Sequence, residues 1–343
     1  MNSLLDALGV TTPVLAAPMA GGATTTALVA AAARAGGLGF VPAGYASART
    51  LAERVAAARA ERVPFGVNVF APNPLPVDRA AFDRYATLVQ ATADRHHVDL
   101  SGQVPVEDDD AFAEKVGLLA EDPVPVVSFT FGIPGRAVVA RLRAAGSLVA
   151  QTVTGVAEAR AAAEAGVDVL VVQAAAAGGH SGTLTPRLSP PDVPVTDLIA
   201  MVRHAVGLPL IAAGGLGTPE DVALVMAAGA QAAMVGTVLL RTEESGASAV
   251  HQAALADPAG RGTVLTRAFT GRPARALRNR FTDLYGDHAP YGYPALHHLT
   301  GPLRKQAAAA GDAGTLHLWA GTGHRRARRE GAGQTLTRLA AAL

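Results

Sequence analysis

Short apolar runs and Ala-rich helical stretches alternate along the first 240 residues of the chain. The runs are rich in Val, Leu, Ala and Ile without polar alternation, which is typical of strands buried on both faces of a parallel sheet. Turns marked by Gly or Pro follow them. We predict eight strands, at residues 14–20, 38–43, 65–70, 124–131, 147–153, 167–173, 209–214 and 232–240.

Helical stretches fill most gaps between these runs, as an α/β fold of the TIM-type (β/α)8 barrel class requires. We predict helices at residues 24–35, 48–62, 136–145, 156–165, 197–206 and 219–228. The last stretch follows Thr218 and begins with Pro219, with Asp221 two residues further on, which is typical of an N-cap with proline at the first helical position. Gly166 and Gly229 stand where glycine commonly ends a helix.

Two regions depart from this alternation. Residues 71–123 form an insertion between the third and fourth strands, with a helix near 79–95 and an acidic run at 107–110 that we interpret as a solvated helix start. After residue 240 come a helix at 248–256, an Arg-rich segment at 266–281 and a helical tail at 294–343. We therefore predict a barrel of residues 1–240 and a mostly helical C-terminal segment, 241–343, that packs on the barrel or closes over it.

Composition narrows the class of protein. Hydrophobic residues make up 50% of the 343 residues and charged residues 17%, which favours a large core over disorder. The net charge of +1 gives no overall attraction to nucleic acid, and the basic cluster at 324–329 lacks interleaved aromatic residues. We interpret that cluster as a solvated helix face and expect no nucleic-acid partner.

Targeting and cysteine chemistry are also constrained. No apolar run approaches the roughly 18 to 20 residues that span a membrane, and the N-terminal residues lack a secretory pattern. Cysteine is absent, which excludes disulfides, thiolate nucleophiles and Cys-ligated zinc. We expect a cytoplasmic protein without a membrane partner or a metal. The sequence does not indicate an oligomeric state.

The C-terminal ends of barrel strands form the active site in this fold. No Asp or Glu stands at a predicted strand end, which argues against paired-carboxylate glycosidases and metal hydrolases. Lys115 and Lys305 lie off the strands, which argues against Schiff-base chemistry, and Ser181 has no acidic orienter. The remaining amides, glycines and one imidazole suit an organic cofactor that brings its own chemistry.

The sixth strand leads into Gly178, Gly179 and His180. Glycine lets a backbone approach a bulky ligand closely, and the imidazole is titratable near neutral pH. From spacing alone, a catalytic and a structural role for His180 are equally open.

Glycines also follow the seventh and eighth strands, in 213–217 and 234–237. Backbone N–H groups there, next to a helix N-terminus, would hold a phosphate; alternatively, the glycines only make tight turns. Asn68 and Gln173 suit the heteroatom edge of a flavin, or else make ordinary loop hydrogen bonds.

Several motifs, taken in chain order, resemble the FMN-dependent nitronate monooxygenases, also called 2-nitropropane dioxygenases. They cover residues 17–22, 66–68, 177–180, 212–215, 236–237, 270–275 and 319–321, so the similarity extends over nearly the whole chain. The resemblance implies a TIM-type barrel that binds FMN and oxidises alkyl nitronates with O₂ to carbonyl compounds and nitrite. It also implies a small-molecule substrate, usually propionate 3-nitronate.

The resemblance implies roles for individual residues. His180 corresponds to the catalytic histidine, and Tyr291 and Tyr293 resemble an aromatic segment near the flavin and the substrate. Ala174 and Ala176 depart from the loop of many relatives, which has Gly and an acidic residue there, so this chain loses a negative charge. The residues that we expect to contact FMN are Met19, Asn68, Gln173, Gly178, Gly179, Gly214, Gly215, Met234, Val235, Gly236 and Thr237.

Two other functions fit much of the same pattern. A related FMN-dependent enoyl-acyl-carrier-protein reductase shares the barrel and the Gly-Gly-His loop but consumes a nicotinamide. The segment from 291 to 319 resembles the monooxygenases more closely than the reductases. A barrel that binds flavin or another phosphate ligand without catalysis is the third candidate.

Overall fold

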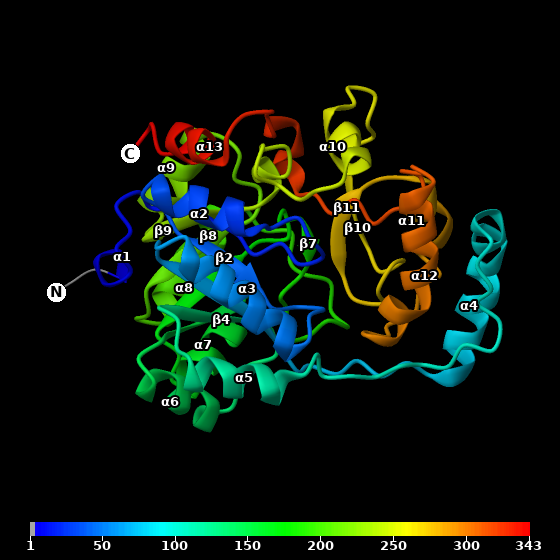
Figure 1. The fold of residues 1–343 in the computed structure, drawn as a ribbon, viewed down its shortest axis with the longest axis horizontal. Helices are drawn as coiled ribbons and strands as arrows, with labels where there is room; N and C mark the ends of the chain where they lie inside the picture. The colour runs from blue at the N-terminus through cyan, green and yellow to red at the C-terminus, as the bar shows by residue number, and fades with distance from the viewer. Residues whose placement is uncertain (1–3) are drawn as a thin grey trace.

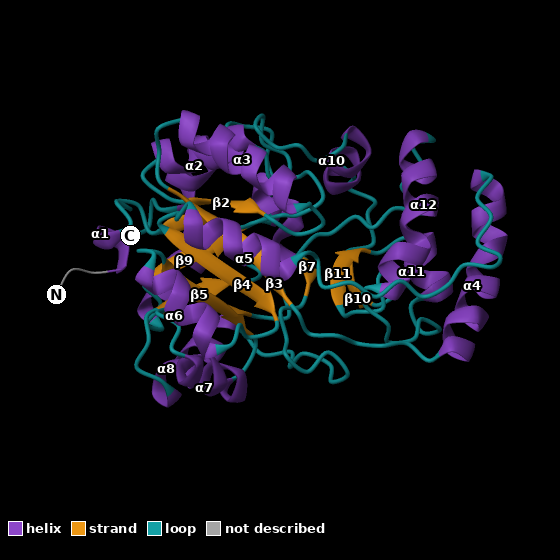
Figure 2. Cartoon of the chain, turned by 60° about the horizontal axis from the view of Figure 1, so that its bottom comes forward, coloured by secondary structure: helices purple, strands orange, loops and turns teal. Residues whose placement is uncertain are grey.

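The computed structural model describes residues 4–343, and its centre is a closed barrel of eight parallel strands (Figures 1 and 2). The predicted TIM-type fold is confirmed. The strands follow the order β1-β2-β3-β4-β5-β6-β8-β9 around the barrel. Their bounds are Val14–Ala16, Gly39–Pro42, Phe65–Ala71, Val126–Phe131, Leu148–Val153, Val169–Gln173, Leu210–Ala213 and Ala232–Val235.

Helices cover the outside of the barrel, as Figure 2 shows. Their capping follows the sequence: the Thr218 side chain accepts a hydrogen bond from the Asp221 backbone N–H, and the Asp221 side chain completes the capping box. Gly166 ends a helix in the left-handed conformation. The covering helices are α2 (Thr26–Arg34), α3 (Ala48–Ala60), α5 (Phe112–Glu121), α6 (Arg136–Ala144), α7 (Val156–Ala165), α8 (Val195–Ala205) and α9 (Pro219–Ala227).

Most barrel strands are one or two residues shorter than predicted, and two are much shorter. β1 ends at Ala16, two residues before Pro18, which has no N–H to donate to a neighbouring strand. β9 ends at Val235, and the chain turns into the 3₁₀-helix η2 (Thr237–Leu239). The residues beyond both strand ends are thereby released into loops at the mouth of the barrel.

The insertion between β3 and β4 serves two parts of the molecule. Its second half, α5, covers the barrel, whereas α4 (Arg79–Ala93) and η1 (Asp94–His96) lie far from it beside α12 (Ala295–Ala309) in Figure 1. Phe82 and Tyr85 of α4 share one apolar core with Leu296 and Leu299 of α12. The insertion therefore helps to support the C-terminal segment.

The acidic run precedes a helix as predicted, although it is not wholly solvated. Asp110 forms an ion pair of 2.7 Å with the buried Lys115 and accepts a hydrogen bond from the Tyr45 backbone N–H. Asp108 pairs with His298 at 2.7 Å. These contacts fix the run against the barrel loops and α12.

The C-terminal segment contains two strands that the sequence did not predict. β10 (Thr263–Thr266) and β11 (Ala274–Leu277) form a three-stranded antiparallel sheet with the two-residue strand β7 (Gly179–His180). In the register, Ala274 lies opposite His180, and Arg275 lies opposite Gly179. The C-terminal segment therefore holds the backbone of His180 in place.

The remaining C-terminal elements are mostly helical. They are α10 (Ala249–Ala256), α11 (Arg280–Tyr285), the 3₁₀-helix η3 (Thr322–Arg326) and α13 (Ala332–Leu339). α13 returns to the barrel and packs on α2 and α9 (Figure 1). Among the described residues, no helix has both the length and the apolar character to cross a membrane.

Candidate active site

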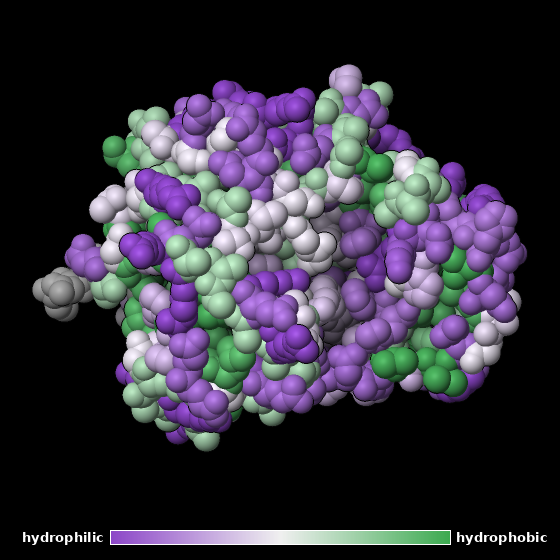
Figure 3. Space-filling model, in the orientation of Figure 1, coloured by the Kyte–Doolittle hydropathy of each residue, from purple (hydrophilic) through white to green (hydrophobic). Residues whose placement is uncertain are grey.

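A cavity of about 640 Å³ lies between the C-terminal ends of the barrel strands and the C-terminal segment. Its volume falls in the range of roughly 300–1,000 Å³ that is common for ligand sites. Figure 3 shows the surface hollowed between these two parts. The cavity lining includes twelve residues that the sequence analysis assigned to the site, namely Met19, Asn68, Gln173, Gly178, Gly179, His180, Gly214, Gly215, Met234, Val235, Gly236 and Thr237.

The loops after β8 and β9 form a glycine-rich part of this lining. Gly214 and Gly215 have φ angles of 106° and 80°, which side chains rarely tolerate. A Cβ on Gly214 would lie 2.9 Å from the Ala174 carbonyl oxygen. At Gly236 a Cβ would make only ordinary contacts with Ala17 and Met19, so the protein itself does not require glycine there. The missing side chain instead leaves open space in the cavity.

The neighbouring helix contributes less to anion binding than the sequence suggested. The backbone N–H groups of Gly217 and Thr218 both donate to Asp221 Oδ2, at 2.9 Å each. These amides at the start of α9 are therefore already occupied by a carboxylate. The glycine loops themselves are the parts that fit a phosphate.

Gly178 is needed for contact with the C-terminal segment. A Cβ there would lie 2.5 Å from the Gly321 nitrogen and 2.7 Å from the Ala320 carbonyl carbon. The Thr322 N–H donates to the Ala176 carbonyl oxygen at 3.0 Å nearby. We predicted that this glycine makes space for a ligand, but the backbone of residues 320 and 321 lies where its side chain would be.

Gln173 and Asn68 use much of their hydrogen-bonding capacity within the protein. Gln173 Nε2 donates to the His180 carbonyl oxygen at 3.3 Å, and Gln173 Oε1 accepts from the Gly182 N–H at 2.7 Å. Asn68 Nδ2 donates to Ser128 Oγ at 3.0 Å and to Thr130 Oγ1 at 3.1 Å. Gln173 thus fixes the His180 loop, and the Asn68 amide oxygen is the part left to a ligand.

His180 lies in a cage of rings at the cavity wall. Its ring centroid is 5.2 Å from that of Trp319 and 5.7 Å from those of Phe131 and Tyr293. Its Nε2 is hydrogen-bonded to Thr270 Oγ1 at 2.9 Å. Burial, together with the positive charges of Arg272 and Arg304, lowers the His180 pKa to about 3. The imidazole is therefore neutral at physiological pH.

The two tyrosines of the sequence analysis separate in the structure. Tyr293 lies beside His180 and is 5.3 Å from Phe131 between ring centroids. Tyr291 instead donates its hydroxyl to the Arg187 carbonyl oxygen at 3.2 Å and lies under the Arg267 guanidinium. Tyr293 lines an adjoining cavity of about 510 Å³, whereas Tyr291 lines neither cavity. The structure thus brings Tyr293 to the site but not Tyr291.

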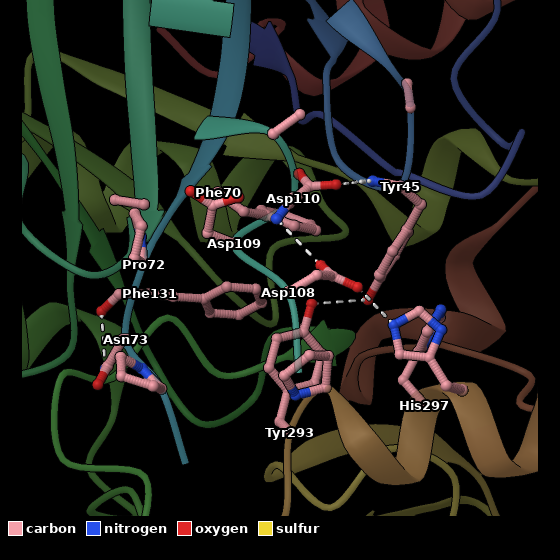
Figure 4. Close-up of a pocket in the computed structure, with 16 residues that line it drawn as sticks. Tyr45, Phe70, Pro72, Asn73, Asp108, Asp109, Asp110, Phe131, Tyr293 and His297 are labelled. Carbon is pink, nitrogen blue, oxygen red and sulfur yellow. Dashed lines mark hydrogen bonds and ion pairs between the residues drawn. The ribbon is translucent and has the colours of Figure 1, made fainter. Parts of the chain in front are cut away.

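A second cavity of about 510 Å³ adjoins the first (Figure 4). Tyr45, Phe70, Phe131 and His297 line both cavities. The Tyr45 ring stacks on His297 with centroids 4.3 Å apart, and burial raises the Tyr45 pKa to about 12. The positive φ of Phe131, 82°, is unusual for a bulky residue and turns its ring into this boundary.

A buried cationic group on the C-terminal side of the cavity was not predicted from the sequence. Arg304 is 8% exposed and lines the cavity, with His297 and His317 on either side of it. The spacing of Leu296, Thr300 and Leu303 carries a signal, because it places position 304 on the buried face of α12.

A second buried arginine, Arg272, supports the His180 loop. Its side chain donates to the Ser181 and Thr183 carbonyl oxygens, and its guanidinium carbon is 4.1 Å from the centre of the Phe131 ring.

Comparisons with known proteins show which family the chain resembles. The model of the family described as "Nitronate monooxygenase" matches residues 2–340. A "Probable nitronate monooxygenase" of Staphylococcus aureus (strain Newman) is 34% identical, covering 93% of this chain and 91% of that protein. The structure of the nitroalkane oxidase from Streptomyces ansochromogenes is 47% identical with a TM-score of 0.91, covering 98% of this chain and 96% of that one. FabK from Thermotoga maritima, 24% identical with a TM-score of 0.77 over 99% of this chain and 94% of that one, shares the fold.

Proposed function

Because the chain belongs to the nitronate monooxygenase family, which makes it a flavin-dependent oxidoreductase, we propose that it binds FMN and oxidises alkyl nitronates with O₂. The products would be a carbonyl compound and nitrite, and propionate 3-nitronate is the substrate that we propose. The observation that carries the proposal is the 640 Å³ cavity, which joins glycine-rich loops on one side to a neutral imidazole on the other.

The cavity residues fit FMN. The loops at Gly214–Gly215 and Gly236–Thr237 would hold the phosphate, because missing side chains there leave backbone N–H groups accessible. Met19 and the Asn68 amide oxygen would face the ring system. The bound flavin supplies electron acceptance and reactivity toward O₂.

The protein residues orient the substrate and exclude water. His180 would contact the nitronate from the ring cage, and Gln173 fixes the loop that carries it. The carbon of a nitronate is already deprotonated, so no base is needed. A neutral nitroalkane must first lose its α-proton, and His180 is the base that we propose for that step, although an imidazole with a pKa of about 3 is a weak one. We therefore expect nitronates to be turned over faster than nitroalkanes.

Two measurements on the purified protein test the proposal. We expect a yellow protein with the visible spectrum of bound flavin, and O₂ uptake with nitrite release when propionate 3-nitronate is added. A colourless protein that FMN cannot reconstitute would overturn the cofactor assignment.

Other outcomes separate the rival functions. Steady NADH oxidation coupled to enoyl reduction would indicate the enoyl-acyl-carrier-protein reductase instead. A yellow protein that consumes no O₂ with any nitronate would indicate a flavin-binding protein without this activity.

A further inference from the structure

We propose that Arg304 binds a carboxylate at the far end of the substrate and so sets a preference for nitronates with a second negative charge. This inference rests on the proposed function and deepens it. It assigns a specificity-determining residue on α12, outside the barrel.

Arg304 is held rigidly at the cavity wall. Its Nε donates to Thr300 Oγ1 at 3.1 Å, and its Nη2 donates to the His297 carbonyl oxygen at 2.8 Å. Its Nη1 and Nη2 also lie 3.3 Å from His317 Nε2 and His297 Nδ1. A guanidinium has five N–H groups, and these contacts use four of them. One N–H group on Nη1 is left for a ligand.

His297 provides a second donor beside it. Since a guanidinium only donates, His297 Nδ1 accepts from Arg304, and the proton of this neutral ring is then on Nε2. The His297 ring lines both cavities. Arg304 and His297 both line the larger cavity and each retain one N–H group, and a carboxylate has one oxygen for each of them.

The charge of Arg304 is not compensated within the protein. Within residues 4–343, no Asp or Glu forms an ion pair with this side chain. Burial lowers the Arg304 pKa to about 10, which still leaves it charged at neutral pH. A buried charge without a partner is costly, and an anionic ligand would relieve that cost.

The position of Arg304 suits the far end of a substrate rather than the reacting carbon. The Trp319 ring centroid is 5.2 Å from that of His180 and 5.3 Å from that of His317, so this ring links the surroundings of His180 to those of Arg304. His317 is in turn the contact of Arg304 Nη1. A three-carbon substrate could place its nitronate group beside His180 and its carboxylate toward Arg304.

The test compares two nitronates of equal chain length, propionate 3-nitronate and propyl-1-nitronate. For Arg304→Met we expect kcat/KM with propionate 3-nitronate to fall at least about 10-fold, because a charged hydrogen bond is lost. With propyl-1-nitronate we expect a change below about 3-fold. Arg278→Met, an exposed arginine of the same segment, is the matched control and should leave the ratio of the two substrates unchanged.

Two outcomes would overturn the assignment. Equal losses on both substrates would show that Arg304 does not recognise the carboxylate, and an unchanged ratio with full activity would show that it has no role. If the wild type oxidised neither nitronate, the proposed function would fail. Anaerobic binding of 3-nitropropionate to the flavin-loaded protein would then still test Arg304, with a dissociation constant expected to rise at least about 10-fold in Arg304→Met.

A measurement on the wild type covers the case in which Arg304→Met does not fold. We expect propionate to compete with propionate 3-nitronate and the isosteric propionamide to compete at least about 10-fold more weakly. Equal inhibition by both compounds would contradict a carboxylate subsite.

Discussion

The two walls of the cavity differ in chemistry. The barrel wall consists of uncharged residues, many of them small, with glycines at 214, 215 and 236, whereas the C-terminal wall carries Arg304, His297, His317 and Trp319. A neutral wall with accessible backbone suits a large cofactor. A wall with a buried cation suits the selection of a small anion. We therefore propose that the barrel binds the flavin and that the C-terminal segment selects the substrate.

His180 lies where the two walls meet. It belongs to the barrel part of the sequence, but β7 pairs with β11 of the C-terminal segment. Its ring faces Phe131 at the end of a barrel strand and Trp319 of the C-terminal segment. The position of the imidazole therefore depends on both walls.

The largest expected effect comes from the residue shared by the two walls. We expect His180→Asn to lower kcat/KM for a neutral nitroalkane by about 100-fold or more, because no other base lies in the ring cage. The loss with the corresponding nitronate should stay below about 10-fold, as measured by O₂ uptake. His204→Asn, on the outer surface at α8, is the control. Equal losses on both substrates would remove the base assignment.

The second-largest expected effect comes from the contact between Gly178 and the C-terminal segment, which joins the two walls. Gly178→Ala places a Cβ against the backbone of residues 320 and 321, which cannot move cheaply, and should cost about 1–3 kcal/mol of stability. Thermal unfolding should show a fall of several degrees. Gly135→Ala, where a Cβ meets open space, should leave the melting temperature nearly unchanged. An unchanged melting temperature in Gly178→Ala would mean that the two walls are not tightly packed at this point.

Acid should weaken the C-terminal wall. Burial and Arg304 lower the pKa of His297 to about 2, and burial lowers that of His317 well below its ordinary value. The contribution of these two histidines to the free energy of unfolding is therefore fully present above the unfolded-state pKa of about 6.5. It is lost as the pH falls below that value, because only the unfolded chain then takes up protons. The loss is at most about 1.4 kcal/mol per pH unit for each such histidine.

Melting temperatures between pH 7.5 and 5.5 test this dependence. Carboxylates with lowered pKa values, such as Asp283 and Glu330, contribute only at lower pH. Burial raises the pKa values of Glu107 and Asp110, which would make stability rise rather than fall with acid, so a fall in melting temperature in this window is due to the histidines. A flat profile would contradict neutral buried imidazoles.

The smallest effect is expected in the phosphate loops. A methyl group at Gly236 meets only ordinary contacts in the protein but would enter the space that we assign to the phosphate. Gly236→Ala should therefore raise the FMN dissociation constant by about 10-fold with the melting temperature of the flavin-free protein unchanged. An unchanged FMN dissociation constant would show that the phosphate does not bind at this loop.

The barrel wall could be predicted from the sequence. Strands buried on both faces appear as continuous apolar runs, and the glycines at their ends mark the loops. The predicted lengths of β1 and β9 were wrong: the strands end at Ala16 and Val235. Where a strand ends depends on its hydrogen bonds to neighbouring strands, which the local sequence does not show.

The C-terminal wall was largely hidden from sequence reasoning. β10 and β11 are short, and the pairing of β11 with β7 joins residues about 95 positions apart, so no local pattern marks it. Arginine is usually solvated, so the residue type at position 304 predicts exposure. Only its spacing from Leu296 and Leu303 indicates that it is buried. Tyr291 was assigned to the site by resemblance, but cation–π contacts with Arg267 and Arg187 hold it outside.

The most direct test of this division of roles is an anaerobic structure of the flavin-loaded protein with 3-nitropropionate. We predict the flavin phosphate at the Gly214–Gly215 and Gly236–Thr237 loops, the nitro group beside His180 and the carboxylate on Arg304. A flavin phosphate bound elsewhere, or a carboxylate directed away from Arg304, would contradict the account.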